Sequence, residues 1–369
     1  MASDNTPQPG NPLRLRKIHH VEMWVGNAKQ ASFFYRNAFG FSQVAYAGLE
    51  TGCRTYTAHV LEQGQARMII KSPLGGEGEI ADHVRRHGDG VKDIAFHVDD
   101  VDRTFEAVLD RGAEPFEEPH DVEDEHGTVR RAAIKTYGET VHSLISTRDY
   151  NGDFLPGYVA KPIPMPDAGL LRFDHIVGNV ELGAMEHWAE WYSRVLGFQR
   201  YIQFTEDQIS TEYSALMSIV MSDNSFAIKF PINEPAVGRN KSQVEEYLDF
   251  YDGPGVQHLA LLTRDIVHTV THLVDRGVSF IHVPDTYYEE LPRRVGSIDE
   301  NVDHLAPLGI LVDRDHEGYL LQTFTEPLVN RPTMFFEIIQ RKGSRGFGEG
   351  NFKALFEAIE RQQAIRGNL

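Results

Sequence analysis

The sequence lacks the features of a secreted, disulfide-bonded or membrane-spanning protein. Cys53 is the single cysteine among 369 residues, so neither an intrachain disulfide nor a cysteine-based zinc site can form. No run approaches the roughly 18 apolar residues of a membrane-spanning helix. The polar segment 1–16 has no apolar signal core. We therefore expect a cytoplasmic protein with no membrane partner.

Basic residues are also scarce. The chain has 36 Lys and Arg against 54 Asp and Glu, a formal net charge of −18. Such a surface repels phosphate backbones, so nucleic acid is not expected as a partner. Hydrophobic residues make up 41% and charged residues 24%, which is typical of a globular protein. The length fits two domains better than one.

An internal repeat organises the chain. Segment 88–98 (GDGVKDIAFHV) is echoed by segment 253–263 (GPGVQHLALLT), at an offset of 165 positions. The same offset relates segment 110–112 (DRG) to segment 275–277 (DRG). Several echoes in one register indicate that one module occurs twice.

Each copy predicts the same order of elements. A short strand leads into a helix that ends at Gly40 or Gly197, and further strands follow. A second helix begins after Asp100 or Asp265, whose carboxylates can cap its free amide groups. The fold class expected is therefore α+β, with two tandem strand-rich modules.

The two copies differ at positions where histidine can bind a metal. His20 of the first copy corresponds to His175 of the second. His258 of the second copy corresponds to Asp93, so the second copy alone has both histidines. Each histidine taken singly can be explained as a buried core residue that binds nothing.

A carboxylate in the last strand is a third difference. Glu337 lies within the apolar run 335–339 (FFEII), where the first copy has Ser143 or Leu144. Burying it unpaired would cost several kcal/mol, although strand alternation could instead turn it to solvent. Two imidazoles and one carboxylate on three strands are the facial triad of non-haem Fe(II) oxygenases. No fourth ligand with matching placement completes a structural zinc site.

These differences divide the chain into five parts. We expect a polar N-terminal tail at 1–16, a module without the metal site at 17–150, and a Pro/Gly-rich linker at 151–170. The metal-binding module follows at 171–342. Residues 343–369 form a glycine-rich hinge and a C-terminal lid helix.

Four motifs give the chain a family resemblance. They are 231–235 (PINEP), 255–260 (GVQHLA), 330–340 (NRPTMFFEIIQ) and 346–352 (GFGEGNF). With them the chain resembles the 4-hydroxyphenylpyruvate dioxygenase family, of the bacterial type, over nearly its whole length. The repeated module is similar to that of the vicinal-oxygen-chelate superfamily. The resemblance implies paired βαβββ units that form open barrel-like sheets, followed by a C-terminal helix.

The resemblance also implies a cofactor, a substrate and an activity. It places one Fe(II) per chain on His175, His258 and Glu337. The implied reaction converts 4-hydroxyphenylpyruvate, a small 2-oxo acid, and O2 to homogentisate and CO2 in tyrosine catabolism. It combines oxidative decarboxylation, ring hydroxylation and side-chain migration. The implied substrate pocket consists of Ser218, Asn233, Gln243, Gln257, Gln322, Phe324, Phe335, Asn351, Phe352 and Phe356.

Two parts of this pocket carry structural expectations. Gln257 adjoins His258, and strict strand alternation would send the two side chains to opposite faces, so we expect a local twist or bulge. Phe352 and Phe356 lie on the apolar face of the last helix. The glycines before this helix would let it hinge as a lid.

Other readings share parts of the site. The nearest is 4-hydroxymandelate synthase, which has the same iron site and substrate but hydroxylates the benzylic carbon. Phe352, Pro231 and Asn233 follow the dioxygenase pattern instead. An extradiol catechol dioxygenase would not explain segment 351–352, and a non-enzymatic module of the superfamily would lack a ligand. The resemblance further implies a homodimer or homotetramer, with His20 as a core residue or a relic.

Overall fold

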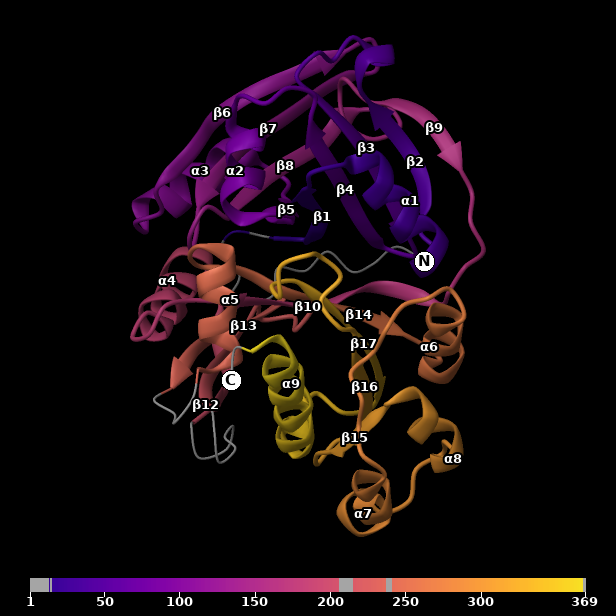
Figure 1. Cartoon of the computed structure of the whole chain (residues 1–369). Helices are drawn as coiled ribbons and strands as arrows, with labels where there is room; N and C mark the ends of the chain where they lie inside the picture. The colour runs from indigo at the N-terminus through magenta and orange to yellow at the C-terminus, as the bar shows by residue number, and fades with distance from the viewer. Residues whose placement is uncertain (1–12, 14, 206–214, 237–240, 368–369) are drawn as a thin grey trace, which may run out of the picture.

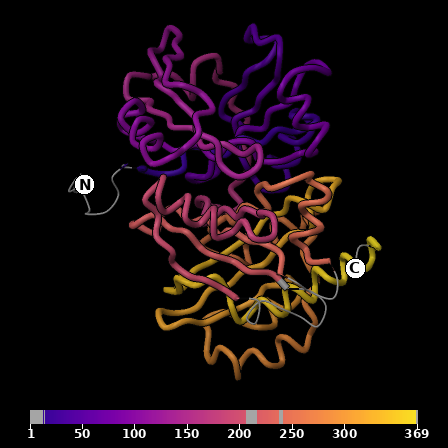
Figure 2. The backbone as a smooth tube through the Cα atoms, turned by 90° about the vertical axis from the view of Figure 1, so that its left-hand side faces the viewer, coloured from indigo at the N-terminus to yellow at the C-terminus, as the bar shows by residue number. Residues whose placement is uncertain are grey.

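The computed structural model describes residue 13 and residues 15–205, 215–236 and 241–367. The strands of each module form one sheet, and the two modules lie one above the other (Figure 1). Figure 2 shows the same arrangement from the side, with the two modules in contact along a broad face. The described residues include no helix long and apolar enough to span a membrane.

The first sheet has the strand order β6-β7-β8-β5-β1-β4-β3-β2-β9. Its strands are β1 (Lys17–Trp24), β2 (Ser42–Ala47), β3 (Tyr56–Gln63), β4 (Ala66–Pro73), β5 (Gly90–His97), β6 (Pro115–Asp124), β7 (Gly127–Lys135), β8 (Val141–Tyr150) and β9 (Val159–Ile163). The helices of this module are α1 (Ala28–Phe39), the short η1 (Leu49–Thr51), α2 (Glu79–His87) and α3 (Val101–Asp110).

The second sheet has the strand order β11-β12-β13-β10-β14-β17-β16-β15. Its strands are β10 (Leu170–Asn179), β11 (Gln199–Phe204), β12 (Ala215–Ser222), β13 (Lys229–Ala236), β14 (Gly255–Thr263), β15 (Leu311–Arg314), β16 (Tyr319–Phe324) and β17 (Phe335–Lys342). The helices are α4 (Met185–Leu196), α5 (Gln243–Tyr251), α6 (Ile266–Val274), α7 (Asp285–Val295), α8 (Val302–Leu305), η2 (Ala306–Leu308), η3 (Glu349–Asn351) and α9 (Phe352–Arg366).

The two sheets share one central arrangement. β1 pairs in parallel with β4 and antiparallel with β5, and β10 pairs in the same way with β13 and β14. β5 and β14 then pair in parallel with the last strands of their modules, β8 and β17. Each module therefore consists of paired βαβββ units, which confirms the expected α+β fold. The second module also has α7 and α8 inserted before β15.

The predicted helix caps are present in both copies. The Asp100 carboxylate accepts a hydrogen bond from the amide of Arg103, and the Asp265 carboxylate accepts one from the amide of His268, each at 3.0 Å. Each bond satisfies a backbone donor that the first turn of a helix leaves free. The repeated aspartates thus start α3 and α6 at equivalent points.

Equivalent β-bulges interrupt the central strands of both modules. The pairing of β10 with β14 skips Asp174 and Gln257, and the pairing of β1 with β5 skips His19 and Lys92. A bulge breaks the strict alternation of a strand and re-aims the side chain beside it. Gln257 and the neighbouring His258 accordingly line the same cavity, as the expected bulge requires.

The segment 151–170, expected to be a linker, contains a strand. β9 pairs antiparallel with β2 and forms the edge of the first sheet. Its Pro162 lacks a donor, which an edge strand tolerates because one side of it has no partner strand. The proline and glycine content that predicted a linker is therefore compatible with an edge strand here.

One hydrophobic core continues from the first module into the second. Phe336 of β17 is fully buried, and its ring centroid lies 5.7 Å from that of Tyr35 and 5.1 Å from that of Phe39, both on α1. Successive side chains of a strand point to opposite faces. Packing of Phe336 against α1 therefore directs the next residue, Glu337, into the second module.

Candidate metal centre

Three neighbouring strands bring the predicted ligands together. His175 lies on β10, His258 on β14 and Glu337 on β17, which are adjacent in the second sheet. Oε2 of Glu337 is 3.0 Å from Nε2 of His175 and 3.3 Å from Nε2 of His258. All three side chains are buried. The two histidines and the glutamate thus form one compact group of possible metal ligands.

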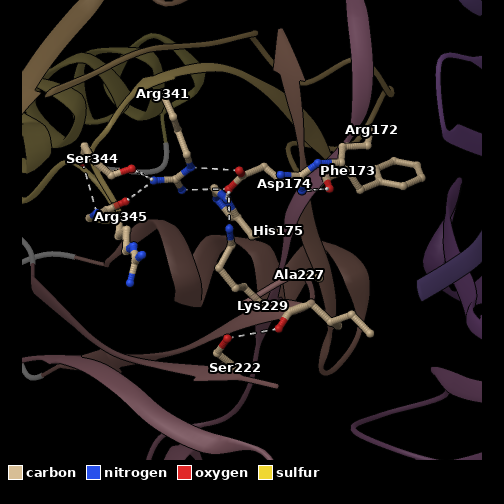
Figure 3. A network of polar contacts seen from close by, with 12 residues as sticks. Arg172, Phe173, Asp174, His175, Ser222, Ala227, Lys229, Arg341, Ser344 and Arg345 are labelled. Atoms are coloured by element: carbon tan, nitrogen blue, oxygen red, sulfur yellow. Dashed lines mark hydrogen bonds and ion pairs between the residues drawn. The ribbon is translucent and has the colours of Figure 1, made fainter. Parts of the chain in front are cut away.

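Asp174, the bulge residue before His175, fixes the orientation of that imidazole. Nδ1–H of His175 donates to Oδ1 of Asp174 at 2.9 Å, and two nitrogens of Arg341 donate to the same carboxylate, each at 2.8 Å (Figure 3). Nζ of Lys229 lies 3.3 Å from Asp174. Burial raises the pKa of Asp174, but Arg341, His175 and Lys229 together hold it well below its ordinary value. Asp174 is therefore a carboxylate that holds the His175 ring with Nε2 toward Glu337. Burial lowers the pKa of His175, but Glu337 and Asp174 outweigh burial and raise it.

The bulge residue Gln257 has the same relation to His258. Nδ1–H of His258 donates to Oε1 of Gln257 at 2.9 Å. The His258 ring also stacks on Phe335, with centroids 4.8 Å apart and planes inclined by 23°. Burial is the main cause that lowers the pKa of His258. A neutral imidazole with Nδ1 protonated presents its Nε2 lone pair to Glu337.

The donor set fits a divalent metal ion. Burial raises the pKa of Glu337, but the effect of His175 and His258 is larger and lowers this pKa to about 2. The carboxyl group is therefore ionised. Nε2 of His258 is buried and makes no hydrogen bond to any residue in the described part of the chain. Two ligand atoms bound at about 2.1 Å and at right angles lie about 3.0 Å apart, close to the observed distances. A divalent cation here would replace any proton shared by Glu337 and His175, and it would also bind Nε2 of His258, which has no hydrogen-bond partner among the described residues.

A cavity opens beside this group. It encloses about 580 Å³ of atom-free space, part of it open to solvent. The three candidate ligands line it. So do most of the residues predicted to bind substrate, namely Ser218, Asn233, Gln243, Gln257, Phe324, Phe335, Phe352 and Phe356.

Gln322 and Asn351, also predicted as substrate residues, lie outside this lining. Oδ1 of Asn351 accepts a hydrogen bond from the Tyr287 hydroxyl at 2.6 Å, which anchors the start of α9. Gln322 is buried in β16 directly beneath Gly348, where an added Cβ would lie 2.3 Å from Nε2 of Gln322. Asn351 therefore supports the loop that leads into α9, and the Gln322 amide lies against that loop without a hydrogen bond to the described residues.

The residue comparison missed several members of the site. Phe347 lines the cavity, and its ring centroid lies 5.0 Å from that of His175. It belongs to motif 346–352, which supports the family resemblance, but the resemblance gave Phe347 no role in the pocket. The sequence signal for Asp174 was its place next to His175. The equivalent residue of the first module, His19, is also a bulge residue. No sequence signal pairs Asp174 with Arg341, since 167 positions separate them.

The fold and the triad place the chain in a known class of metal-dependent proteins. Residues 17–137 and 172–323 match the Glyoxalase/Bleomycin resistance protein/Dioxygenase superfamily. The two matched segments correspond to the two modules, so the chain belongs to this superfamily.

Curated relatives narrow the class further. The 4-hydroxyphenylpyruvate dioxygenase of Aspergillus fumigatus is 49% identical over 95% of this chain and 93% of its own length. The Dictyostelium discoideum protein of the same name is 49% identical over 96% and 100%, and that of Xenopus tropicalis 48% over 96% and 93%. The chain belongs to the 4-hydroxyphenylpyruvate dioxygenase family. These relatives are eukaryotic, so they do not confirm the expected bacterial type.

Solved structures share the fold of this chain. A triple mutant of 4-hydroxymandelate synthase from Streptomyces coelicolor superimposes with a TM-score of 0.84 and 32% identity, over 96% of this chain and 100% of that one. A fusion of a xylose isomerase-like TIM barrel with 4-hydroxyphenylpyruvate dioxygenase has a TM-score of 0.72 at 22% identity, covering 97% of this chain and 54% of that one, which shows the fold alone.

Proposed function

We propose that this chain is an Fe(II)-dependent dioxygenase that converts 4-hydroxyphenylpyruvate and O2 to homogentisate and CO2 in tyrosine catabolism. The observation that carries the proposal is the buried His175, His258 and Glu337 group at the wall of an aromatic-lined cavity. Identities of 48–49% to dioxygenases that act on this substrate support it. We further propose one Fe(II) per chain, a cytoplasmic location, and a homodimer or homotetramer.

The three ligands would hold Fe(II) with half of its coordination positions open. Bound there, Fe(II) supplies the positions at which a 2-oxo acid and dioxygen meet. One ionised carboxylate leaves a divalent centre with net positive charge. Arg341 and Lys229 more than offset the charge of Asp174. The centre therefore attracts the carboxylate end of the substrate.

The cavity wall would place the rest of the substrate. Phe324, Phe335, Phe352 and Phe356 form an apolar enclosure for a phenyl ring and keep water from the reacting atoms. Gln257 uses Oε1 to accept from His258, which leaves its Nε2 hydrogens to donate to a bound ligand. Ser218 and Asn233 face each other across the β12–β13 pair and supply further polar contacts. An apolar wall with few polar groups suits a phenol.

Product analysis tests the proposal. The iron-loaded protein is mixed with 4-hydroxyphenylpyruvate in air, and the products are separated beside authentic homogentisate and 4-hydroxymandelate. Homogentisate is expected. 4-Hydroxymandelate would contradict the ring-hydroxylation assignment and favour the synthase, whose structural relative is less similar at 32% identity. His268→Gln, at an exposed position on α6, serves as a control that should keep full turnover.

The position of Phe352 favours the dioxygenase over the synthase. Its ring lies 4.9 Å from Phe204 in an edge-on contact, and both rings line the cavity. An aromatic residue here fills part of the cavity and would limit how the substrate ring can turn. Phe352→Leu is therefore expected to raise the share of side-chain hydroxylation. An unchanged product ratio would remove Phe352 from the specificity argument.

A further inference from the structure

A second group of possible metal ligands lies at the junction of the two modules. His83 and His87 are one turn apart on α2 and therefore share a helix face. Glu139 comes from the turn between β7 and β8, with Oε2 at 3.1 Å from Nε2 of His87 and 3.6 Å from Nδ1 of His83. Within the described ranges, this group and the candidate centre are the two sets of three or more His, Cys, Asp or Glu residues whose ligand atoms lie within 4.8 Å of one another.

His87 has the orientation of a metal-binding histidine. Its Nδ1–H donates to the backbone carbonyl of Tyr251, the last residue of α5, and its ring stacks on that tyrosine at 4.5 Å. Nε2 then presents a lone pair to the Glu139 carboxylate. A backbone carbonyl that fixes the far nitrogen is the usual support of a metal-ligating imidazole. The same pattern is seen at His258, where Gln257 provides the oxygen.

The environment of His83 distinguishes two explanations of this group: a bound metal ion, or a single proton shared by His87 and Glu139. Its side chain is 1% exposed, and neither ring nitrogen makes a hydrogen bond to the described residues. A shared proton would satisfy His87 and Glu139 but would leave His83 without a partner. A metal ion satisfies all three.

The charge around the group is compatible with a cation. Oε1 of Glu139 accepts from Arg86 at 2.8 Å, and Arg86 also pairs with Asp252 at 2.6 Å. Lys92, which lies over the Trp24 ring beside His83, pairs with Glu79 at 3.2 Å, so its charge is also offset. The Glu139 side chain is 39% exposed, which gives water access to a fourth coordination position. Imidazole nitrogens favour zinc and its neighbours among divalent ions.

We propose that His83, His87 and Glu139 bind a second, structural divalent transition-metal ion of the zinc class, independent of the catalytic centre. The ion joins α2 to the β7–β8 turn at the place where α2 contacts the second module. There His87 donates to Tyr251, and Arg331 donates to the carbonyl of Arg85 at 3.2 Å. Occupancy of this site therefore stabilises the contact between modules.

The proposal is tested by measuring zinc binding in a variant that lacks the catalytic metal site at His175, His258 and Glu337. The full chain carrying His175→Gln and Glu337→Gln is stripped with chelator, dialysed against Zn²⁺, and measured for metal content and Tm. We expect about one equivalent of zinc and a Tm raised by at least about 2 °C. Adding Glu139→Gln should abolish both effects. This variant keeps the size of a half-exposed side chain, so it is compatible with folding.

A second pair of histidines provides the matched control. His268 and His272 have the same spacing on α6 but belong to no described group of three ligands. Changing both to Gln should leave the zinc content and the Tm shift unchanged. Loss of zinc in this control but not in Glu139→Gln would overturn the proposal. So would an absence of zinc from the chain that retains His83, His87 and Glu139.

Discussion

β10, β14 and β17 of the second module bring two histidines and a glutamate together, while β1, β5 and β8 of the first module place other residues at the equivalent points. These are His20, Asp93 and Ser143, since Asp93 faces Val141 as His258 faces Phe335. The register thereby decides between Ser143 and Leu144. Ser143 donates its amide and its hydroxyl to Asp93, at 2.9 and 2.5 Å. The first module satisfies its buried carboxylate internally, without a metal ion.

The cavities of the two modules differ accordingly. That of the first module encloses about 1110 Å³ of atom-free space and is lined by buried ion pairs such as Glu22 with Lys71. That of the second module is smaller and lined mainly by apolar side chains, six of them phenylalanines. Both modules nevertheless keep the bulges beside these positions. The backbone geometry of the metal centre is therefore independent of the metal, and a few side chains separate the two modules.

The largest expected effect comes from giving the second module the residues of the first. In His258→Asp/Glu337→Ser, one ligand changes type and another is lost. We expect iron content to fall to background and homogentisate formation to fall by at least about 1,000-fold, because a bound metal ion contributes several kcal/mol of catalysis. Metal analysis and a product assay check this. Retained iron would mean that other residues bind it.

The next largest effect is expected from Asp174→Asn, which removes the carboxylate that Arg341 and Lys229 share. Two buried cations then lose their counter-charge, at a cost of about 3 kcal/mol in the free energy of unfolding. Affinity for iron should fall about 10- to 100-fold, because the His175 ring loses its support. Urea unfolding and competition with a chelator measure the two effects. Arg172→Gln, which changes a half-buried neighbour on β10, is the control. Equal losses of stability and of iron affinity in this variant would show that the effect is not specific to the Asp174 carboxylate.

Asp93→Asn is expected to stabilise the folded protein, in contrast to Asp174→Asn. Burial raises the pKa of Asp93 to about 6, from 3.8. A raised carboxyl pKa means that the folded state binds the proton more tightly, so stability falls as the pH rises from 3.8 to about 6. The variant removes this loss and should be about 3 kcal/mol more stable than the natural protein at neutral pH, with little difference near pH 4. Urea unfolding at both pH values checks it, and a destabilised variant at neutral pH would show that the Ser143 bonds dominate.

Comparison of the two copies was enough to predict the fold class and to isolate the candidate ligands. The repeat exposed His258 and Glu337 as differences, and the aspartate caps marked α3 and α6 because capping depends on local sequence. The family resemblance placed Gln257 in the pocket, strand alternation then required a bulge beside His258, and the register contains one. Local chemistry and strand periodicity carried these inferences, without knowledge of contacts between distant segments.

The remaining features depend on such distant contacts. Arg341 meets Asp174 only when the sheet brings β10 and β17 near each other. β9 forms because the edge of β2 offers free backbone groups. The proline-rich composition of segment 151–170 does not predict this pairing. Asn351 matched the family pattern as a residue type, but Tyr287, from an inserted helix, determines its hydrogen bond. Pairings of this kind follow from tertiary structure.

The smallest expected effect concerns α9, the element without a counterpart in the first module. Gly348 precedes it with φ +79, and an added Cβ would lie 2.3 Å from Nε2 of the buried Gln322. Gly348→Ala should therefore cost about 1–2 kcal/mol of stability and should raise KM, because Phe352 and Phe356 are displaced from the cavity. Gly277→Ala is the matched control, since φ is +85 and nothing lies within 4 Å of an added Cβ. Equal stability losses with an unchanged KM would mean that backbone strain alone acts at Gly348. A rise in KM confined to Gly348→Ala would show that α9, which has no counterpart in the first module, shapes the cavity of the second module.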